Sequence, residues 1–254
     1  LFTNFLMRIL VSNDDGYQAE GIKQLTLALS EIAEVIIVAP NENKSAASSS
    51  LTIGKPLKPI QIEHNIYAID ATPSDCVHLA LCGFIKDPID LVVTGINLGA
   101  NLGDDVIYSG TVAGAIEGRF LGLPSIAISL ASWQCKHFET AAIIALRLVE
   151  KIEKAPLSHN TIINVNVPDV PIGDIKGIKS TRLGNRHMSE PSIQDENNSS
   201  LYWIGENGQE ADNGEGTDFY AIANNFVSVT PLQIDLTKYS EVKQVSEWLE
   251  DLDY

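Results

Sequence analysis

The segment MRILVSNDDG, residues 7–16, decides the fold. Its apolar run over residues 8–12 ends abruptly in Asn13-Asp14-Asp15-Gly16, and apolar residues then recur at helical spacing over residues 22–32. The next run, residues 35–39 (VIIVA), is continuously apolar and stops at Pro40. Such a run is typical of a strand buried on both faces of a parallel sheet. The segment and its continuation therefore predict a strand–helix–strand unit.

The same alternation continues to about residue 168 and predicts an α/β fold with a mostly parallel sheet covered by helices on both faces. We expect strands at 57–62, 66–69, 90–94, 125–129 and 161–165, and helices at 73–82, 111–121 and 137–151. Beyond Pro168 the chain is more polar, and residues 185–218 are interpreted as a hairpin or arm. A strand at 226–230 and an amphipathic helix at 240–252 would close one domain, residues 7–254, with its core at about 7–168 and the arm and closing helix at about 169–254.

The charge balance excludes several classes of partner. The 254 residues carry 17 basic and 33 acidic side chains, which gives a net charge of −16. A duplex nucleic-acid binder needs a basic footprint, and anionic lipid also attracts basic segments, so neither partner is expected. An anionic substrate would need something local to reverse the field, and a bound cation is the usual solution.

Three cysteines and the absence of a long apolar run bear on the compartment. Cys76, Cys82 and Cys135 are odd in number and show no CxxC spacing, so we interpret them as thiols in a reducing compartment. No apolar run approaches the ~18 residues of a membrane helix. Residues 1–6 are interpreted as an extension before a more natural beginning at Met7, and they lack the features of a signal peptide. A cytoplasmic protein is expected.

Polar side chains gather where three predicted strands end, which is the edge where open α/β sheets bind ligands. Asp14 and Asp15 follow the first strand, and no Lys or Arg stands beside them in the sequence. The pair could simply form a turn. A divalent cation would remove their mutual repulsion, and oxygen ligands favour Mg²⁺, Mn²⁺ or Ca²⁺. Ser45 and Asn97, from the two neighbouring loops, would complete the site, although each could also be an ordinary loop residue.

The tripeptide Ser109-Gly110-Thr111 precedes a helix that starts with small residues. Unpaired amides at a helix N-terminus attract anions such as phosphate, and Gly110 would let the backbone come close. The alternative is an ordinary N-cap formed by Ser109 or Thr111. We therefore interpret this tripeptide as a candidate phosphate site.

Other motifs are absent or weaker. The chain lacks a P-loop, a GxGxxG fingerprint, a GxSxG elbow and metal-binding histidine spacings. A small basic cluster, Arg182, Arg186 and His187, fits a solvated loop or the neighbourhood of an anionic substrate. Tyr202 and Trp203 could stack on a base or pack against another subunit.

Together, MRILVSNDDG from Met7, APNENKSAASSSLT from Ala39 and TGINLGANLGDDVIYSGTVAGAIEGR from Thr94 resemble the SurE family of stationary-phase survival nucleotidases. The family usually has Gly where Ala46 stands. The resemblance implies a Rossmann-like core, and a divalent-metal-dependent phosphatase of nucleoside 5′- and 3′-monophosphates that in some members also trims short polyphosphate. It also implies homodimers or homotetramers that exchange a C-terminal arm between subunits.

The resemblance places one metal ion (Mg²⁺ or Mn²⁺, with Co²⁺ as a further candidate) on Asp14, Asp15, Ser45 and Asn97. We expect the metal to activate a water that Asp14 positions, with Asp15 and Asn97 as its catalytic companions. Ser109, Gly110 and Thr111 would hold the phosphoryl oxygens, and Asn101 would add a hydrogen bond.

Three alternatives from other classes remain open. A haloacid-dehalogenase-type phosphatase needs two aspartates separated by one residue, but Asn13 stands two positions before Asp15. A non-catalytic nucleotide or phosphate sensor could use the same edge of the sheet. A metal-using glycosyltransferase could use the two aspartates to hold a nucleotide-sugar diphosphate.

Overall fold

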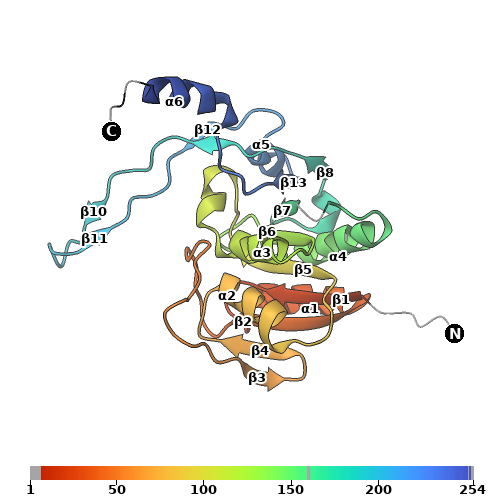
Figure 1. Ribbon diagram of the computed structural model, residues 1–254. Helices are drawn as coiled ribbons and strands as arrows, with labels where there is room; N and C mark the ends of the chain where they lie inside the picture. The colour runs from red at the N-terminus through yellow and green to blue at the C-terminus, as the bar shows by residue number, and fades with distance from the viewer. Residues whose placement is uncertain (1–6, 159–160, 251, 253–254) are drawn as a thin grey trace.

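The computed structural model describes residues 7–158, 161–250 and 252, so the expected extension at residues 1–6 lies outside the described part. A nine-stranded sheet forms the body, in the order β3-β4-β2-β1-β5-β6-β7-β13-β8 (Figure 1). Neighbours from β4 to β7 pair in parallel, whereas β3 and β13 run antiparallel to β4 and β7. The strands are β1 (Met7–Ser12), β2 (Ala33–Pro40), β3 (Ile60–Glu63), β4 (Ile66–Ile69), β5 (Leu91–Leu98), β6 (Ser125–Leu130), β7 (Ile162–Val167), β8 (Gly177–Ser180) and β13 (Phe226–Leu232). The predicted α/β class and mostly parallel sheet are confirmed.

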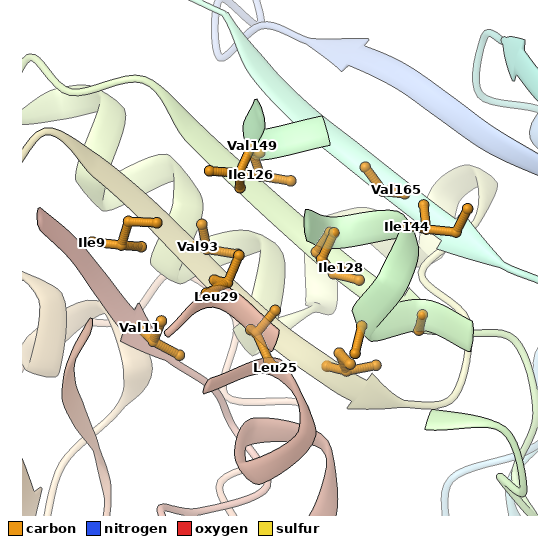
Figure 2. Packing of buried hydrophobic residues seen from close by; sticks show 14 of the residues in the cluster. Ile9, Val11, Leu25, Leu29, Val93, Ile126, Ile128, Ile144, Val149 and Val165 are labelled. Carbon is orange, nitrogen blue, oxygen red and sulfur yellow. The ribbon is translucent and has the colours of Figure 1, made fainter. Parts of the chain in front are cut away.

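Helices cover both faces of this sheet. Two of them, α1 (Glu20–Leu29) and α4 (Phe138–Lys154), pack on one face together with the buried side chains of β1, β5, β6 and β7 (Figure 2). The other face is covered by α2 (Pro73–Leu79) and α3 (Gly110–Phe120). Leu25 and Leu29 of α1 are fully buried, and each contributes about 1.5–3 kcal/mol by leaving water. The remaining helices are α5 (Asp218–Ala223), α6 (Val242–Leu249) and the short turns η1 (Ala80–Phe84), η2 (Gly103–Tyr108), η3 (Ile172–Asp174) and η4 (Tyr239–Glu241).

Element boundaries differ from the sequence predictions in small, explicable ways. The strand expected at 57–62 begins only at Ile60, where pairing with β4 starts. The helix expected to reach Cys82 ends at Leu79 and continues as the wider η1 turn. Ser109 caps α3, because its hydroxyl accepts a hydrogen bond from the Val112 N–H at 3.0 Å.

The chain after residue 168 contributes to the main sheet as well as to an arm, so the sheet extends beyond the core expected at about 7–168, and the strand expected at 226–230 is part of it. Its β8 and β13 join the main sheet, because β13 returns antiparallel to β7. The arm lies within the expected range of residues 185–218 and contains two short ladders, β9 (Asn185–Arg186) with β12 (Glu210–Asp212), and β10 (Ile193–Gln194) with β11 (Tyr202–Trp203). It projects from the body in Figure 1.

The expected closing helix forms as α6, but it does not close over the core. None of its residues is buried, and Val245 and Trp248 are among its exposed apolar side chains. Within the described residues, no helix is long and apolar enough to cross a bilayer.

The strand order fixes where a ligand can bind. Strand β1 lies between β2 and β5, so the order of the sheet reverses at this point. Helix α1 follows β1 on one face, and α2 precedes β5 on the other. In open α/β sheets the crevice at such a reversal, beyond the carboxyl ends of the strands, is the ligand site.

Candidate active site

Asp14 lies at the carboxyl end of β1 and is almost completely buried, with 4% of its surface exposed. The turn around it is tied to the loop after β2, because the Lys44 N–H donates to the Asp14 carbonyl at 2.7 Å. The turn also closes on itself through the Asn13 amide, which donates to the Gly16 carbonyl at 2.9 Å. The polar residues of NDDG therefore build the turn and also present a carboxylate at the sheet edge.

Asn97 is aimed by an irregularity near the end of β5. The pairing register with β6 shifts between Thr94 and Asn97, and a Cβ at Gly95 would lie 2.2 Å from the Ile128 carbonyl oxygen. Only glycine fits there, and such a bulge redirects the following side chain. The Asn97 amide nitrogen donates to the Gly99 carbonyl at 2.8 Å. The Oδ1 atom of Asn97 therefore points away from Gly99.

Thr111 joins the two strand ends. Its fully buried hydroxyl lies in hydrogen-bonding contact with Asp14 Oδ1, and 3.3 Å from Asn97 Oδ1. A Cβ at Gly110 would lie 2.8 Å from the Asp14 Cβ, so the absence of a side chain there makes room for the carboxylate. Asp14 and Asn97 are thus held together by the first turn of α3.

Gly110 and Thr111 contact Asp14 in this structure, and their expected role as phosphate-binding residues stays a prediction. Their backbone N–H groups act on the Asp14 carboxylate, and neither residue lines the cavity described below. The N-terminus of α3 does attract an anion, but that anion is Asp14 itself. Ser109, one position earlier, is the member of the tripeptide that reaches the cavity.

The electrostatics of the two aspartates are unusual. Burial raises the pKa of Asp14, although the hydrogen bonds from Thr111 and the α3 backbone partly oppose it. Burial raises the pKa of Asp15 to about 6, and the nearby Asp14 charge adds to this effect. The hydrogen bond from the Leu98 N–H opposes it. None of the ion pairs formed by the described residues includes either carboxylate. The pair is therefore short of positive charge.

A cavity of about 220 Å³ opens beside these groups. Its lining consists of Asp14, Ser45, Ala46, Asn97, Leu98, Ala100, Asn101, Asp105, Tyr108, Ser109, Trp133 and Asn207. Five of the predicted site residues thus share one cavity. In the part of the chain that the structure describes, no Lys, Arg or His lines it.

A larger cavity, about 830 Å³, lies along α1 and the β3–β4 edge. Its lining mixes aliphatic side chains with Tyr17 and with polar and charged residues such as Lys23 and Glu63, and it includes none of the predicted site residues. Volume alone therefore does not locate the chemistry, and the smaller cavity at the strand reversal is the candidate site.

The residues fit a hard divalent cation by the chemistry of their donors. Among the described residues, no group of three or more His, Cys, Asp or Glu could hold a metal. The set here instead adds an amide and a hydroxyl oxygen to two carboxylates, which suits an oxygen-preferring ion. The Ser45 N–H donates to Asn43 Oδ1 at 2.8 Å, and the Asn43 amide reaches Asp15 Oδ1 at 3.4 Å, so the Ser45 loop is tied to the aspartates.

Sequence reasoning missed the residues that hold the Asn101 loop. Asn164 and Asn166 of β7 each donate a side-chain hydrogen bond to the Asn101 carbonyl at 2.9 Å. The Asn101 amide in turn donates to the Ser129 hydroxyl at 2.7 Å. Buried Asp218 accepts from the Gly103 N–H at 2.7 Å and also receives the Gly184 N–H at the base of the arm. The sequence did hold a sign of this role, because two asparagines at alternate positions of the apolar strand IINVNV share one face of the sheet.

The basic cluster expected at residues 182–187 does not act as a unit. Arg186 pairs with Asp105 at 2.8 Å and stacks over Phe219, whereas Arg182 pairs with Asp212 and His187 is exposed. Trp203 lies on the arm, where its indole N–H donates to Asp195 at 2.9 Å.

Comparison with known proteins identifies the family of this chain. The model of the family described as "Survival protein SurE" matches residues 9–190. A protein of Vesicomyosocius okutanii named 5′-nucleotidase SurE is 70% identical over 97% of this chain and 99% of its own length. One of the same name from Legionella pneumophila is 54% identical over 97% of this chain and 98% of its own. The crystal structure of the SurE protein from Aquifex aeolicus is 42% identical and has a TM-score of 0.85, covering 96% of this chain and 100% of that one. The resemblance seen in the sequence is therefore confirmed, and this chain belongs to the SurE family.

Proposed function

We propose that this protein is a 5′-nucleotidase, a phosphohydrolase that uses a divalent metal ion to release phosphate from nucleoside monophosphates. The name shared by its relatives supports the reaction class. The observation that carries the metal dependence is the cavity itself, which presents carboxylates, amides and hydroxyls but, in the described chain, no basic side chain. A phosphate dianion would be repelled there unless a cation were bound.

Asp14, Asp15, Ser45 and Asn97 would hold the cation, which we expect to be Mg²⁺ or Mn²⁺, with Co²⁺ as another candidate. When bound, it lowers the pKa of a water and screens the incoming dianion. Asp14, fixed by Thr111 and the α3 amides, orients the attacking water. Gly110 and Thr111 serve as positioning residues for that carboxylate.

The phosphoryl group would contact Ser109 and Asn101. The Ser109 oxygen accepts from the Val112 N–H, so its own O–H remains available as a donor. The Asn101 amide nitrogen uses one hydrogen on Ser129, and its second hydrogen can reach a phosphoryl oxygen. Donors fixed in advance stabilise the charge that shifts in the transition state, and losing one typically costs about 10²–10³ in rate.

The test is phosphate release from AMP by the wild type, Asp14→Asn and Asp87→Asn, with chelator and metal add-back. Asp87 is an exposed carboxylate outside the cavity and serves as the matched control. We expect chelation to abolish wild-type turnover, added Mg²⁺ or Mn²⁺ to restore it, and only Asp14→Asn to stay inactive while folded. Full metal-dependent turnover by Asp14→Asn would refute the assignment. Tight nucleotide binding without phosphate release would favour a sensor, and a trapped aspartyl-phosphate or sugar transfer would favour the two enzymatic alternatives.

We also propose activity on nucleoside 3′-monophosphates and short polyphosphate. The Ser109 hydroxyl and the Asn101 amide would contact only the phosphoryl group of a substrate, so neither of them distinguishes a 5′ from a 3′ ester. The same assay with 3′-AMP tests the first activity, and with tripolyphosphate it tests the second. Absence of phosphate release from either substrate would refute the activity on that substrate alone.

We propose that the arm and α6 bind a second copy of this chain, in a homodimer or homotetramer with exchanged arms. Exposed apolar side chains concentrate on these two segments, including Trp203, Ile204 and Trp248, and the helix buries nothing in its own chain. Light scattering should give the mass of two or four chains, and Trp248→Ala should shift it toward the monomer. A monomeric wild type would refute the proposal.

We place the enzyme in the cytoplasm. Its three cysteines are free, as expected in a reducing compartment. Fractionation of cells that express the full chain tests this assignment, and recovery outside the cytoplasm would overturn it.

A further inference from the structure

Trp133 is an exposed aromatic side chain at the mouth of the candidate site. It lies in the loop between β6 and α4, keeps 81% of its surface exposed, and lines the same cavity as Asp14, Asn97 and Ser109. Tyr108, which is 61% exposed, lines this cavity as well. Two exposed aromatic side chains that border one cavity form an apolar rim, and exposed apolar patches of this kind mark ligand-binding grooves.

The loop that carries Trp133 is held in place at both ends. The Ala131 N–H donates to the Val167 carbonyl at 2.8 Å. The N–H groups of Lys136 and His137 donate to Asp169 at 3.0 and 2.9 Å. A side chain presented by an anchored loop loses little freedom when a ligand binds it.

The indole ring also rests against the loop that carries Asn97. A Cβ at Gly99 would lie 2.9 Å from the Trp133 Cζ3 atom, so the ring packs directly on the Gly99 backbone. Gly99 has φ +105° and accepts the Asn97 amide bond at 2.8 Å. The ring is thus placed relative to the predicted metal ligands by a direct contact.

The cavity is too small to enclose a whole nucleotide. Its volume of about 220 Å³ falls below the roughly 300–1,000 Å³ of pockets that surround a small ligand. With the phosphate beside Asp14 and Ser109, the base of a nucleoside monophosphate must extend to the rim. The residues on that rim include the two exposed aromatic side chains.

We propose that Trp133 is a stacking platform for the nucleobase, which makes it the residue that selects nucleotides over simpler phosphate esters and purines over pyrimidines. The inference rests on the proposed function and specifies its substrate class. Every base has a π-face, so an indole ring accepts all of them, and a purine offers the larger face. Tyr108 borders the same rim and contributes a second apolar wall.

The test compares AMP, CMP and ribose 5-phosphate as substrates of the wild type, Trp133→Ala, Trp133→Phe and Gln134→Ala. Gln134 is the exposed neighbour in the same loop and does not line the cavity, so it is the matched control. Because base stacking on an aromatic ring is worth about 10-fold or more in affinity, Trp133→Ala should raise KM for AMP about 10-fold. It should raise KM for CMP less, and it should change kcat and KM for ribose 5-phosphate far less than those for AMP. Trp133→Phe should recover most of the loss.

Two results would overturn the proposal. One is an unchanged KM for AMP in Trp133→Ala, and the other is an equal loss for AMP and ribose 5-phosphate, which would mean that the ring only supports the Asn97 loop. If the wild type released no phosphate from any substrate, the proposed function would fail by itself. Quenching of Trp133 fluorescence by AMP but not by ribose 5-phosphate, measured against Trp133→Phe with Mg²⁺ present, would then still decide whether the base stacks.

Discussion

Replacing Gly110 by alanine should impair turnover strongly while leaving the protein folded. The new Cβ would lie 2.8 Å from the Asp14 Cβ and 2.9 Å from its Oδ2 atom, whereas ordinary contacts begin at 3.4 Å. The deficit between 3.4 and 2.8 Å means that the carboxylate must move by roughly 0.6 Å. Asp14 is buried and bonded to Thr111, so it cannot turn away into solvent.

The two consequences of this displacement differ in size. A misplacement of about 1 Å can cost about 10² in rate, so a shift of this order should lower kcat about 30- to 100-fold. Overpacking costs about 1–3 kcal/mol, and alanine regains up to about 1 kcal/mol over glycine in a helix. The net loss of about 0–3 kcal/mol in the free energy of unfolding corresponds to a fall in Tm of at most about 12 °C.

The assay is steady-state phosphate release from AMP, combined with thermal unfolding of the same preparations. Gly173→Ala is the control, because a Cβ at that position meets no atom within 4 Å. We expect Gly173→Ala to match the wild type in both measurements. A folded Gly110→Ala protein with kcat within threefold of the wild type would show that the position of Asp14 does not control the reaction.

Three further outcomes follow from the same contacts. Saturating Mg²⁺ or Mn²⁺, at about 100 times its Kd, should stabilise the native state by about 2.7 kcal/mol and raise Tm by about 5–10 °C; Asp14→Asn should lose this shift in calorimetry. The pKa of Asp169 is lowered, because the hydrogen bonds that it accepts at the start of α4 outweigh burial, which raises it. The stabilising contribution of Asp169 is therefore present above about pH 4 and is lost as the pH falls through its folded-state pKa. Urea unfolding at acidic pH should show this loss of stability in the wild type, and Asp169→Asn should lack the part that Asp169 contributes. Asp218→Asn should cost about 1–3 kcal/mol in urea unfolding by weakening the bonds to Gly103 and Gly184, and a neutral result would refute that role.

The fold was accessible from the sequence where local pattern and packing agree. The continuous run at residues 35–39 became β2, and the helical spacing at residues 22–32 became α1 with Leu25 and Leu29 buried. The four-residue β8 was not predicted, because GIKS has no strong pattern and is ordered by pairing with β13. Pairing partners far away in the chain override weak local preference.

The sequence predicted that the candidate site residues lie close together, and their roles stay predictions. Asp14, Ser45, Asn97, Asn101 and Ser109 line one cavity, since the ends of neighbouring strands meet at one edge. A helix N-terminus predicts that an anion will be bound, but spacing alone does not distinguish an external phosphate from an internal carboxylate. The distinction at α3 depends on how closely β1 and α3 approach, which is a tertiary property.

The acidic character of this protein has a consequence for how its ligands cooperate. The cavity contains Asp14 and Asp105, and Arg186 is already paired with the latter. Under the proposed function, the charge that attracts a phosphate would be supplied by the cation that Asp14 and its companions would hold. An anion that binds only beside the cation also tightens the binding of that cation by the same factor, because coupling between two sites is reciprocal. The net charge of −16 opposes a phosphate substrate on its own. If the proposed function holds, this charge makes the binding of substrate conditional on metal, and the neutral face of the base would be recognised by the aromatic rim.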